Sequence, residues 1–480
     1  MSQLQHLTPA RVFAYFEEIS AIPRGSGNQK AIADYCVDFA KQHGLQYERD
    51  AANNVIIRKP AAPDYEQAQT VILQGHLDIV CQKTEQSTIC FETDGLTLLT
   101  DGDFITADGT TLGADNGIAV AMILAVLEDA NLPHPALEAV FTSDEEIGMI
   151  GAMQLDMQSL NGKKMINLDA EEDDTLTVSC AGGSDLAMRL PLSRHNANGT
   201  LVSVSLKGLK GGHSGMEIDK GSVNADILAG RILSHVNQSI PFDIVSIDGG
   251  DKGNAIPNAC QIRLCTANAA TLAAELTAYA QQVAQEIKER EEHFSIEVTI
   301  GENGEYAVFD RQQTEKLLSA LLCTPNGVMD MSASIPGLVE TSLNLGILKT
   351  DDNTVLLHFT LRSNKASALT FLEERMIAFA QQLDFDVECF GHYPPWEYRE
   401  NSDLQALFID RYTAQRGTTP KVEAIHAGLE CGVFASAIEN LDCIAIGPAL
   451  FDVHTTNERL SISSTAKTFC LLLDILKNCR

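Results

Sequence analysis

Short apolar runs alternate with amphipathic segments in the N-terminal part of the chain. Residues 70–75, 137–141 and 164–169 are rich in apolar side chains, as are strands that a sheet buries on both faces. Apolar residues recur at helical spacing around these runs, at residues 12–19, 29–43 and 118–129. Strands that alternate with helices predict an α/β fold with a mostly parallel, doubly wound sheet flanked by helices.

The pattern changes at about residue 187 and returns to its first form at about residue 400. Residues 201–206 alternate apolar and polar side chains, as half-exposed antiparallel strands do. Two successive sets of strands and helices follow, with helices predicted at residues 222–236, 271–290, 312–322 and 369–383. We therefore predict an α/β domain formed by residues 1–187 and 400–480, interrupted by an α+β domain of residues 188–399 that is internally doubled.

The composition argues against several classes of partner. The chain has 480 residues, more than one core usually holds, and a formal net charge of −31. Nucleic acids and anionic membranes attract proteins with a surplus of Lys and Arg, so we expect neither as a partner. The first residues do not resemble a signal peptide, and no window approaches the roughly 18 apolar residues of a membrane span. We therefore expect a cytoplasmic protein.

The 12 cysteines are scattered, and no pair has Cys-x-x-Cys spacing. In a large chain with these features they are expected to be reduced, mostly buried thiols that serve packing. A zinc site with thiolate ligands is not expected at this spacing. A nucleotide site is not expected either, because the sequence has no Walker motif and no GxGxxG after the first strand.

Two adjacent carboxylates, Glu145 and Glu146, follow the predicted strand at residues 137–141. An isolated Glu-Glu pair is usually a solvated surface feature, because burying two uncompensated negative charges is costly. A functional role therefore requires positive charge at the same place. His76 and Asp169 also lie just past strand ends, and open α/β sheets bind ligands at the carboxyl ends of their strands.

Divalent metal ions could supply that charge. In His76-x-Asp78, the carboxylate can hold the second ring nitrogen of a metal-bound imidazole. Glu145 could stay unligated and act as general base on a water that two ions activate. Such a mixture of imidazole and carboxylate ligands suits Zn²⁺, Mn²⁺ or Co²⁺ more than Ca²⁺. Unrelated acidic residues at strand ends remain the alternative at this point. The other candidate ligands are spread along the chain: Asp115, Glu146, Asp169 and His454.

Five short motifs, in this order along the chain, resemble the metal-site motifs of the M20 family of dinuclear metallopeptidases. The likeness extends over essentially the whole chain, including residues 21–24, and within the family it is strongest to aminoacyl-histidine dipeptidases. The motifs are His76-Leu77-Asp78, Gly-Ala-Asp-Asn-Gly at residues 113–117, Asp-Glu-Glu-Ile-Gly at residues 144–148, Asn167-Leu168-Asp169 and His454.

The resemblance implies a role for each candidate residue. His76 and Asp169 would bind one ion, and Glu146 and His454 would bind the other. Asp115 would bridge the two ions. The implied catalytic residues are Asp78, which orients His76, and Glu145, which takes a proton from water and passes it to the leaving amine.

The inserted domain resembles the lid of the same family. His213, in the glycine-rich loop at residues 211–215, matches a lid histidine that supports the oxyanion of an active site. Asn254 and Arg362 match lid positions suited to the substrate carboxylate, for which Arg offers a bidentate fork. The plain alternatives are an exposed loop histidine and a salt bridge on a strand surface. His426 and Glu430 are not expected to contact the substrate directly.

The resemblance implies a metal-dependent dipeptidase that cleaves dipeptides with a free C-terminal carboxylate. The expected substrates are Xaa-His dipeptides, including carnosine-like ones, and the expected cofactors are two divalent ions per subunit. Zn²⁺ is expected, with Co²⁺ and Mn²⁺ as alternatives. We expect a homodimer, in which a lid histidine acts on the neighbouring site, and the alternative is that the doubled lid fills this role within one chain. The alternatives are an N-acyl amino acid deacylase or aminoacylase of the same family, and a metal- or peptide-binding protein without activity.

Overall fold

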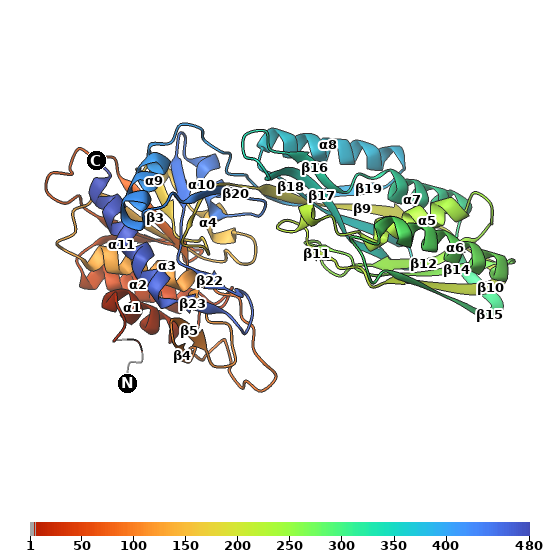
Figure 1. Ribbon diagram of the computed structural model, residues 1–480, viewed down its shortest axis with the longest axis horizontal. Coiled ribbons are helices and arrows are strands. Elements are labelled where there is room, and N and C mark those ends of the chain that lie inside the picture. The colour runs from red at the N-terminus through yellow and green to blue at the C-terminus, as the bar shows by residue number, and fades with distance from the viewer. Residues whose placement is uncertain (1–3, 5) are drawn as a thin grey trace. The chain divides into compact units, whose positions relative to one another are not determined.

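The computed structural model describes Leu4 and residues 6–480. The chain folds into two compact units, each built around a large sheet of its own (Figure 1). The first unit comprises Met1–Cys180, Trp396–Ala424 and Leu429–Arg480, and the second comprises Ala181–Pro395 and Ile425–Gly428. Within the described residues, no helix has both the length and the apolar character needed to cross a bilayer.

The first unit contains an eight-stranded sheet in the order β1-β2-β6-β3-β7-β21-β8-β20. Its central strands β6, β3, β7 and β21 are parallel, whereas β1, β2 and β8 pair in the antiparallel sense. β3 and β6 are buried at every position, which explains their apolar runs. The predicted α/β fold with a mostly parallel sheet is thus confirmed. The strands are β1 (Gln46–Arg49), β2 (Val55–Lys59), β3 (Val71–His76), β6 (Leu137–Thr142), β7 (Lys164–Asn167), β8 (Thr175–Cys180), β20 (Lys421–Ile425) and β21 (Asp442–Ala445).

Helices and a second, four-stranded sheet complete the first unit (Figure 1). The most apolar helix is α3, which is buried along almost its whole length because it packs against both α1 and β3. The small sheet has the order β22-β23-β5-β4 and joins the C-terminal segment to the loop before α3. The helices are α1 (Ala10–Ser20), α2 (Lys30–Gln42), α3 (Ala114–Glu128), α4 (Ile150–Gln154), α9 (Asp403–Arg416), α10 (Glu430–Ala437) and α11 (Ile462–Asn478), and the small strands are β4 (Leu98–Asp101), β5 (Phe104–Ala107), β22 (Leu450–Phe451) and β23 (Arg459–Ser461).

The second unit is a nine-stranded antiparallel sheet with the main order β15-β10-β14-β12-β17-β18-β9-β19 and β16 paired to β17. The helices bury their apolar residues in one cluster with alternate residues of the strands. A two-stranded ribbon, β11 with β13, lies outside this sheet. The elements are β9 (Gly182–Pro191), β10 (Arg194–Lys207), β11 (Gly212–His213), α5 (Ala225–Val236), β12 (Asp243–Gly249), β13 (Ala255–Ile256), β14 (Cys260–Thr266), α6 (Ala269–Ile287), β15 (Ser295–Phe309), α7 (Arg311–Cys323), β16 (Gly327–Met331), β17 (Val339–Thr350), β18 (Thr354–Ser363), α8 (Ala366–Gln382) and β19 (Asp386–Tyr393).

The strand order explains why the sequence of this unit predicts two successive, similar sets of strands and helices. β10-α5-β12-β14-α6-β15 forms one half of the sheet, and β9-α7-β17-β18-α8-β19 forms the other. Each half is a βαββαβ unit in which the fourth strand lies beside the first, followed by the third and the second. The first half is inserted between β9 and α7 of the second, and the halves meet where Gly249 of β12 pairs with Leu348 of β17.

The apolar pattern predicted some strands poorly. The apolar alternation of β15 ends at Ile300, but the strand continues to Phe309 because it pairs with β10 as far as Arg194. Most of its side chains are exposed or half-buried, so backbone pairing and not an apolar pattern sustains its length. β8 and β9, which end the first unit and begin the sheet of the second, were not predicted.

Candidate metal centre

The carboxyl ends of three parallel strands bring the predicted ligands of the first unit together. His76 is the last residue of β3, Asp169 follows β7, and Glu146 lies in the loop after β6. His76 is buried, and its Nε2 lies 3.5 Å from Asp169 Oδ1. The parallel pairing of β6, β3 and β7 places these loops side by side, as the sequence predicted.

Asp115 lies between two histidines that come from opposite ends of the chain. Its Oδ1 lies 3.2 Å from His76 Nε2, and its Oδ2 lies 3.0 Å from His454 Nε2. His454 Nε2 also lies 3.1 Å from Glu146 Oε2. Potential ligand atoms thus form two groups that share one carboxylate: His76, Asp115 and Asp169 in the first, and Asp115, Glu146 and His454 in the second.

The protonation of this cluster is governed by its excess of carboxylates. Burial raises the pKa of Asp169 to about 6. Hydrogen bonds to Asp115 and Glu146 raise the pKa of His454 to about 11. Burial lowers the pKa of His76, but the charge of Asp169 and hydrogen bonds to nearby carboxylates outweigh it and leave this pKa well above its usual value. Without metal, both imidazoles therefore hold protons where a cation could bind.

The side chains fit a pair of divalent ions. Glu146 Oε1 is buried and has no hydrogen-bond partner among the described residues, which is costly for a carboxylate oxygen unless a cation binds it. The three ligand carboxylates and Glu145 carry four negative charges when ionised, which two divalent ions would neutralise. Imidazole and carboxylate donors suit Zn²⁺, Co²⁺ and Mn²⁺ alike, so the donor set alone does not select the ion.

Asp78 contacts both His76 and the segment that carries the two glutamates. Its Oδ1 lies 3.4 Å from His76 Nδ1. Its carboxylate also accepts hydrogen bonds from the backbone N–H groups of Glu145, at 3.0 Å, and Glu146, at 3.2 Å. Although burial opposes ionisation, the hydrogen bond and charge of His76 lower the pKa of Asp78. Asp78 therefore stays ionised beside an imidazole whose other nitrogen points at the candidate metal ligands.

Glu145 lies beside the two ligand groups. One of its oxygens lies within 4.8 Å of ligand atoms of His76 and Glu146. Burial, together with the negative charges of Asp169, Glu430 and Glu146, raises the pKa of Glu145 well above its usual value. A carboxylate with a raised pKa next to a metal site has the property required of a general base.

The predicted lid residues lie in the second unit. His213 Nδ1 accepts hydrogen bonds from the backbone N–H groups of Gly215 and Met216, both at 3.1 Å. Burial and the positive charge of Arg362 lower the pKa of His213. The ring is therefore neutral with its proton on Nε2, where it can donate a hydrogen bond.

Arg362 and Asn254 lie in the same part of the second unit. Arg362 is buried on β18 and donates a hydrogen bond from Nη1 to Tyr393 Oη at 2.8 Å, while its Nε has no hydrogen-bond partner among the described residues. Arg362 therefore does not form a salt bridge on the strand surface, which was the alternative interpretation. Asn254 is exposed, and its carbonyl accepts a hydrogen bond from Ser214 N at 2.9 Å, beside His213. His426 is a buried structural residue, bonded to Ser342 Oγ at 2.7 Å and Asn364 Oδ1 at 3.2 Å.

Residues 72–478 match the model of Peptidase family M20/M25/M40. The chain belongs to this family. It is 35% identical to the cytosol non-specific dipeptidase of Escherichia coli (strain K12) over 481 residues, which cover 99% of each chain. The crystal structure of aminoacylhistidine dipeptidase from Vibrio alginolyticus superposes with a TM-score of 0.91 at 35% identity and covers 99% of this chain and 98% of that one. Human carnosine dipeptidase 1, at 12% identity and a TM-score of 0.52, shares the fold.

Sequence reasoning missed Glu458, which holds the loop before α3 in this M20 chain. Its carboxylate accepts four consecutive backbone hydrogen bonds, from Leu112 at 2.8 Å, Gly113 at 3.0 Å, Ala114 at 2.9 Å and Asp115 at 3.3 Å. Glu458 lies four residues after His454, so one short C-terminal loop supplies both a candidate ligand and the support for the shared candidate ligand. A single Glu in a polar loop carries no local signal of this role.

Arg24 and Asn116 are buried in the first unit, and both form hydrogen bonds to the backbone of segments that carry the candidate ligands. Arg24 is fully buried and donates hydrogen bonds to the carbonyls of Leu77, at 2.9 Å, and Gly113, at 2.6 Å. Asn116 accepts a hydrogen bond from His76 N at 3.2 Å and donates one to Leu168 O at 3.0 Å. Both residues fall within the M20 motifs, which was the available signal, although neither was assigned a role.

Glu430 is the first residue of α10 and is buried. Thr142 Oγ1 donates a hydrogen bond to its Oε2 at 2.6 Å, and Gln74 donates another to the same oxygen. Burial is the main reason why the pKa of Glu430 is raised to about 8. Thr142 and Gln74 lie on β6 and β3, so this carboxyl links α10 to the two strands that carry His76 and the Glu145-Glu146 loop.

Proposed function

We propose that this M20 chain is a metal-dependent dipeptidase that hydrolyses the peptide bond of dipeptides with a free C-terminal carboxylate. One observation carries the proposal: two groups of candidate ligands share Asp115, and a Glu145 oxygen lies within 4.8 Å of a ligand atom of each group, on His76 and on Glu146. A shared carboxylate suits two ions a short distance apart, and such pairs stabilise both the attacking and the leaving group of a hydrolysis.

Bound ions would lower the pKa of a water molecule and polarise the scissile carbonyl. Glu145, which lies beside the ligands, would take a proton from that water and then give it to the leaving amine. Asp78 holds His76 in the orientation in which Nε2 faces the metal ligands. We assign the metal ligands as His76 and Asp169 for one ion, Glu146 and His454 for the other, and Asp115 for both.

We assign substrate recognition to three residues of the second unit. Arg362 is buried with an unpaired Nε, and a guanidinium in this state binds a carboxylate strongly. His213 is a neutral donor suited to an oxyanion. Asn254 offers an exposed amide in the adjoining loop. Capture of a free C-terminal carboxylate would restrict the enzyme to short peptides.

The finer features of the proposal rest on the relatives. The likeness to the aminoacylhistidine dipeptidase of Vibrio alginolyticus supports Xaa-His dipeptides as substrates, and we include carnosine-like ones among them. The likeness to the cytosol non-specific dipeptidase of Escherichia coli supports a broader choice of dipeptide and a cytoplasmic location. We further propose Zn²⁺ as the native ion, with Co²⁺ and Mn²⁺ as functional substitutes, and a homodimer as the working form.

A substrate panel combined with metal analysis tests the proposed function. The metal-loaded protein is incubated with Xaa-His dipeptides, other dipeptides, C-terminally amidated dipeptides and N-acetyl amino acids. Cleavage of free dipeptides and loss of cleavage on amidation are expected. Cleavage of N-acetyl amino acids alone would instead identify a deacylase, and absence of all cleavage by protein with two bound ions would identify a binding protein.

A further inference from the structure

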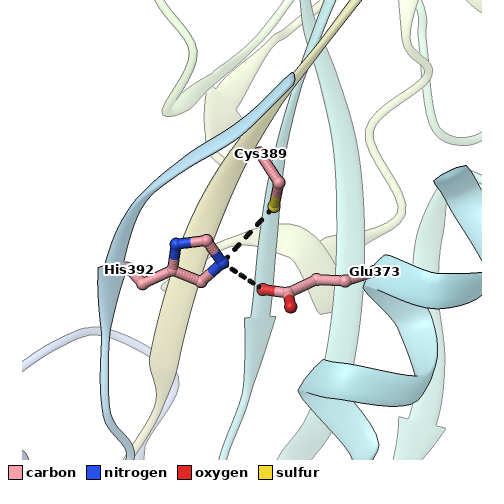
Figure 2. Close-up of side chains that lie close together, drawn as sticks. All are labelled: Glu373, Cys389 and His392. Atoms are coloured by element: carbon pink, nitrogen blue, oxygen red, sulfur yellow. Dashed lines mark hydrogen bonds and ion pairs between the residues drawn. The ribbon is translucent and has the colours of Figure 1, made fainter. Parts of the chain in front are cut away.

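A second type of ligand cluster lies in the second unit, built from a glutamate, a cysteine and a histidine. Glu373 comes from α8, and Cys389 and His392 come from β19 (Figure 2). The three ligand atoms lie within 4.8 Å of one another. His392 Nε2 is 3.1 Å from Glu373 Oε1 and 3.5 Å from Cys389 Sγ. Figure 2 shows the thiol and the carboxylate pointing toward the same ring nitrogen.

A bulge in β19 brings Cys389 and His392 to the same side. In a regular strand, residues three apart point to opposite faces. Here Phe390 pairs with Asp185 and Tyr393 with Gly183, so three steps along β19 match two along β9. Gly391, at the extra step, has a φ of +64°. A glycine in the left-handed region at a bulge changes the direction of the next side chain. Here the bulge directs the side chain of His392 toward Cys389 and α8.

Two of the three separations between donor atoms are close to those of a tetrahedral metal site. Zn–S and Zn–N bonds of about 2.3 and 2.05 Å at the tetrahedral angle separate sulfur from nitrogen by about 3.6 Å, and Zn–N and Zn–O bonds separate nitrogen from oxygen by about 3.4 Å. The corresponding distances here are 3.5 Å and 3.1 Å. The thiol and the carboxylate thus already lie near the ring nitrogen at about the separations that an ion requires, and sulfur and oxygen lie within 4.8 Å of each other.

The donors also match such an ion in charge. Glu373 Oε1 is buried and has no hydrogen-bond partner of normal geometry within the described part of the chain, although it lies beside the imidazole. A carboxylate and a thiolate together neutralise a divalent ion, so the complex would leave no unpaired charge in this half-buried place. A thiolate beside an imidazole selects Zn²⁺ or Co²⁺ over Mg²⁺ and Ca²⁺.

We propose that Glu373, Cys389 and His392 bind one Zn²⁺ ion in the second unit, in addition to the ions proposed for the first unit. Half of the His392 side chain is exposed, at 52%, so solvent reaches this ligand. β19 is the last strand of its sheet and pairs only with β9. The ion would fasten this edge strand to α8, a structural role that does not depend on the dipeptidase function.

Cobalt substitution of the full-length protein tests the site. The metal-free protein is titrated with Co²⁺, and the near-ultraviolet absorption is followed for the thiolate-to-cobalt charge-transfer band. No candidate ligand in the first unit has a sulfur atom, so this band reports the Cys389 site whether or not the dipeptidase proposal holds. Once all sites are filled, we expect the band of the wild type to have the intensity of one thiolate-bound Co²⁺ per chain, and we expect no band in Cys389→Ser and His392→Gln.

Matched controls separate this site from other thiols and histidines. Cys323→Ser and His195→Gln change an exposed cysteine and an exposed histidine of the same unit, and both variants should retain the band. After dialysis against Zn²⁺, elemental analysis should find one ion fewer per chain in Cys389→Ser than in Cys323→Ser. A wild type without the band, a band that survives in Cys389→Ser, or equal zinc contents in these two variants would overturn the proposal. Because His392 is exposed, its variant keeps the test valid if Cys389→Ser fails to fold.

Discussion

The carboxylate of Asp78 accepts a hydrogen bond from the backbone N–H of Glu145 at 3.0 Å. Asp78 also accepts one from Glu146 N at 3.2 Å and lies 3.4 Å from His76 Nδ1. One buried carboxylate thus sets the positions of a proposed ligand on β3 and of the loop that carries the proposed base. Asp78 does more than orient an imidazole, because it fixes the distance between the two halves of the site.

Asp78→Asn should therefore impair both metal binding and turnover. The amide keeps the size of the side chain but loses the charge and one acceptor oxygen. Groups that hold metal ligands in place typically contribute 10–100-fold to metal affinity or activity, and we expect a loss of about that size. Metal titration and dipeptide kinetics measure it, with the exposed Asp38→Asn as control. Wild-type metal affinity and kcat in Asp78→Asn would contradict this role.

Glu145→Gln should abolish most of the turnover and leave the metal content unchanged. A general base typically contributes about 10²–10⁴-fold to a rate, and Glu145 is not one of the assigned ligands. The comparison is kcat on a dipeptide together with metal equivalents per chain, and the exposed Glu172→Gln serves as control. Loss of metal in parallel with activity would make Glu145 a ligand, whereas unchanged kcat would remove it from the mechanism.

Glu458→Gln should destabilise the first unit and weaken metal binding. The carboxylate accepts four backbone hydrogen bonds from the loop that ends at Asp115, and an amide oxygen cannot satisfy all of them. Hydrogen bonds to a charged group contribute about 1.5–3 kcal/mol each, so a loss of at least about 1.5 kcal/mol in unfolding free energy is expected. Denaturant unfolding and metal titration measure the two effects, against the exposed Glu439→Gln. Unaltered values for both would mean that the loop holds its shape without this residue.

Asp226 should make the stability of the protein fall as the pH rises. Burial raises the pKa of this carboxyl to about 8, and neither oxygen has a hydrogen-bond partner among the described residues. Between about pH 4 and pH 8 the folded chain keeps a proton that the unfolded chain, with a pKa near 3.9, has released. Each pH unit in this window should therefore remove about 1.4 kcal/mol of unfolding free energy.

Asp226→Asn removes this titration. The variant should gain stability relative to the wild type as the pH is raised from 5 to 8, as measured by denaturant unfolding at several pH values. Asp219→Asn, at an exposed position in the same unit, should keep the wild-type dependence. Parallel curves for the wild type and Asp226→Asn would refute the raised pKa.

The sequence could predict the local elements and the order of the metal-site motifs. The apolar runs of β3 and β6 and the carboxylates just past their ends are properties of neighbouring residues, and parallel strands always place their carboxyl ends at one edge. The periodicity of α1 and α2, and the two successive α+β sets, could be read for the same reason. Family resemblance then supplied roles for Asp115 and His454, which local pattern alone could not assign.

Only the tertiary structure decided the features that depend on backbone hydrogen bonds between distant segments. Glu458 accepts hydrogen bonds from the backbone amides of Leu112 and Asp115, which lie more than 340 residues earlier in the sequence. A pattern of side chains cannot predict hydrogen bonds to backbone amides. The length of β15 rests on pairing with β10, because its residues between Ile300 and Tyr306 are polar or glycine and predict no strand. Cys389 and His392 would face opposite sides of an ideal strand, and the bulge at Gly391 brings them together beside Glu373. The sequence determined the candidate ligands and base of the first unit, whereas the fold decided what holds them in place and where another set of candidate ligands converges.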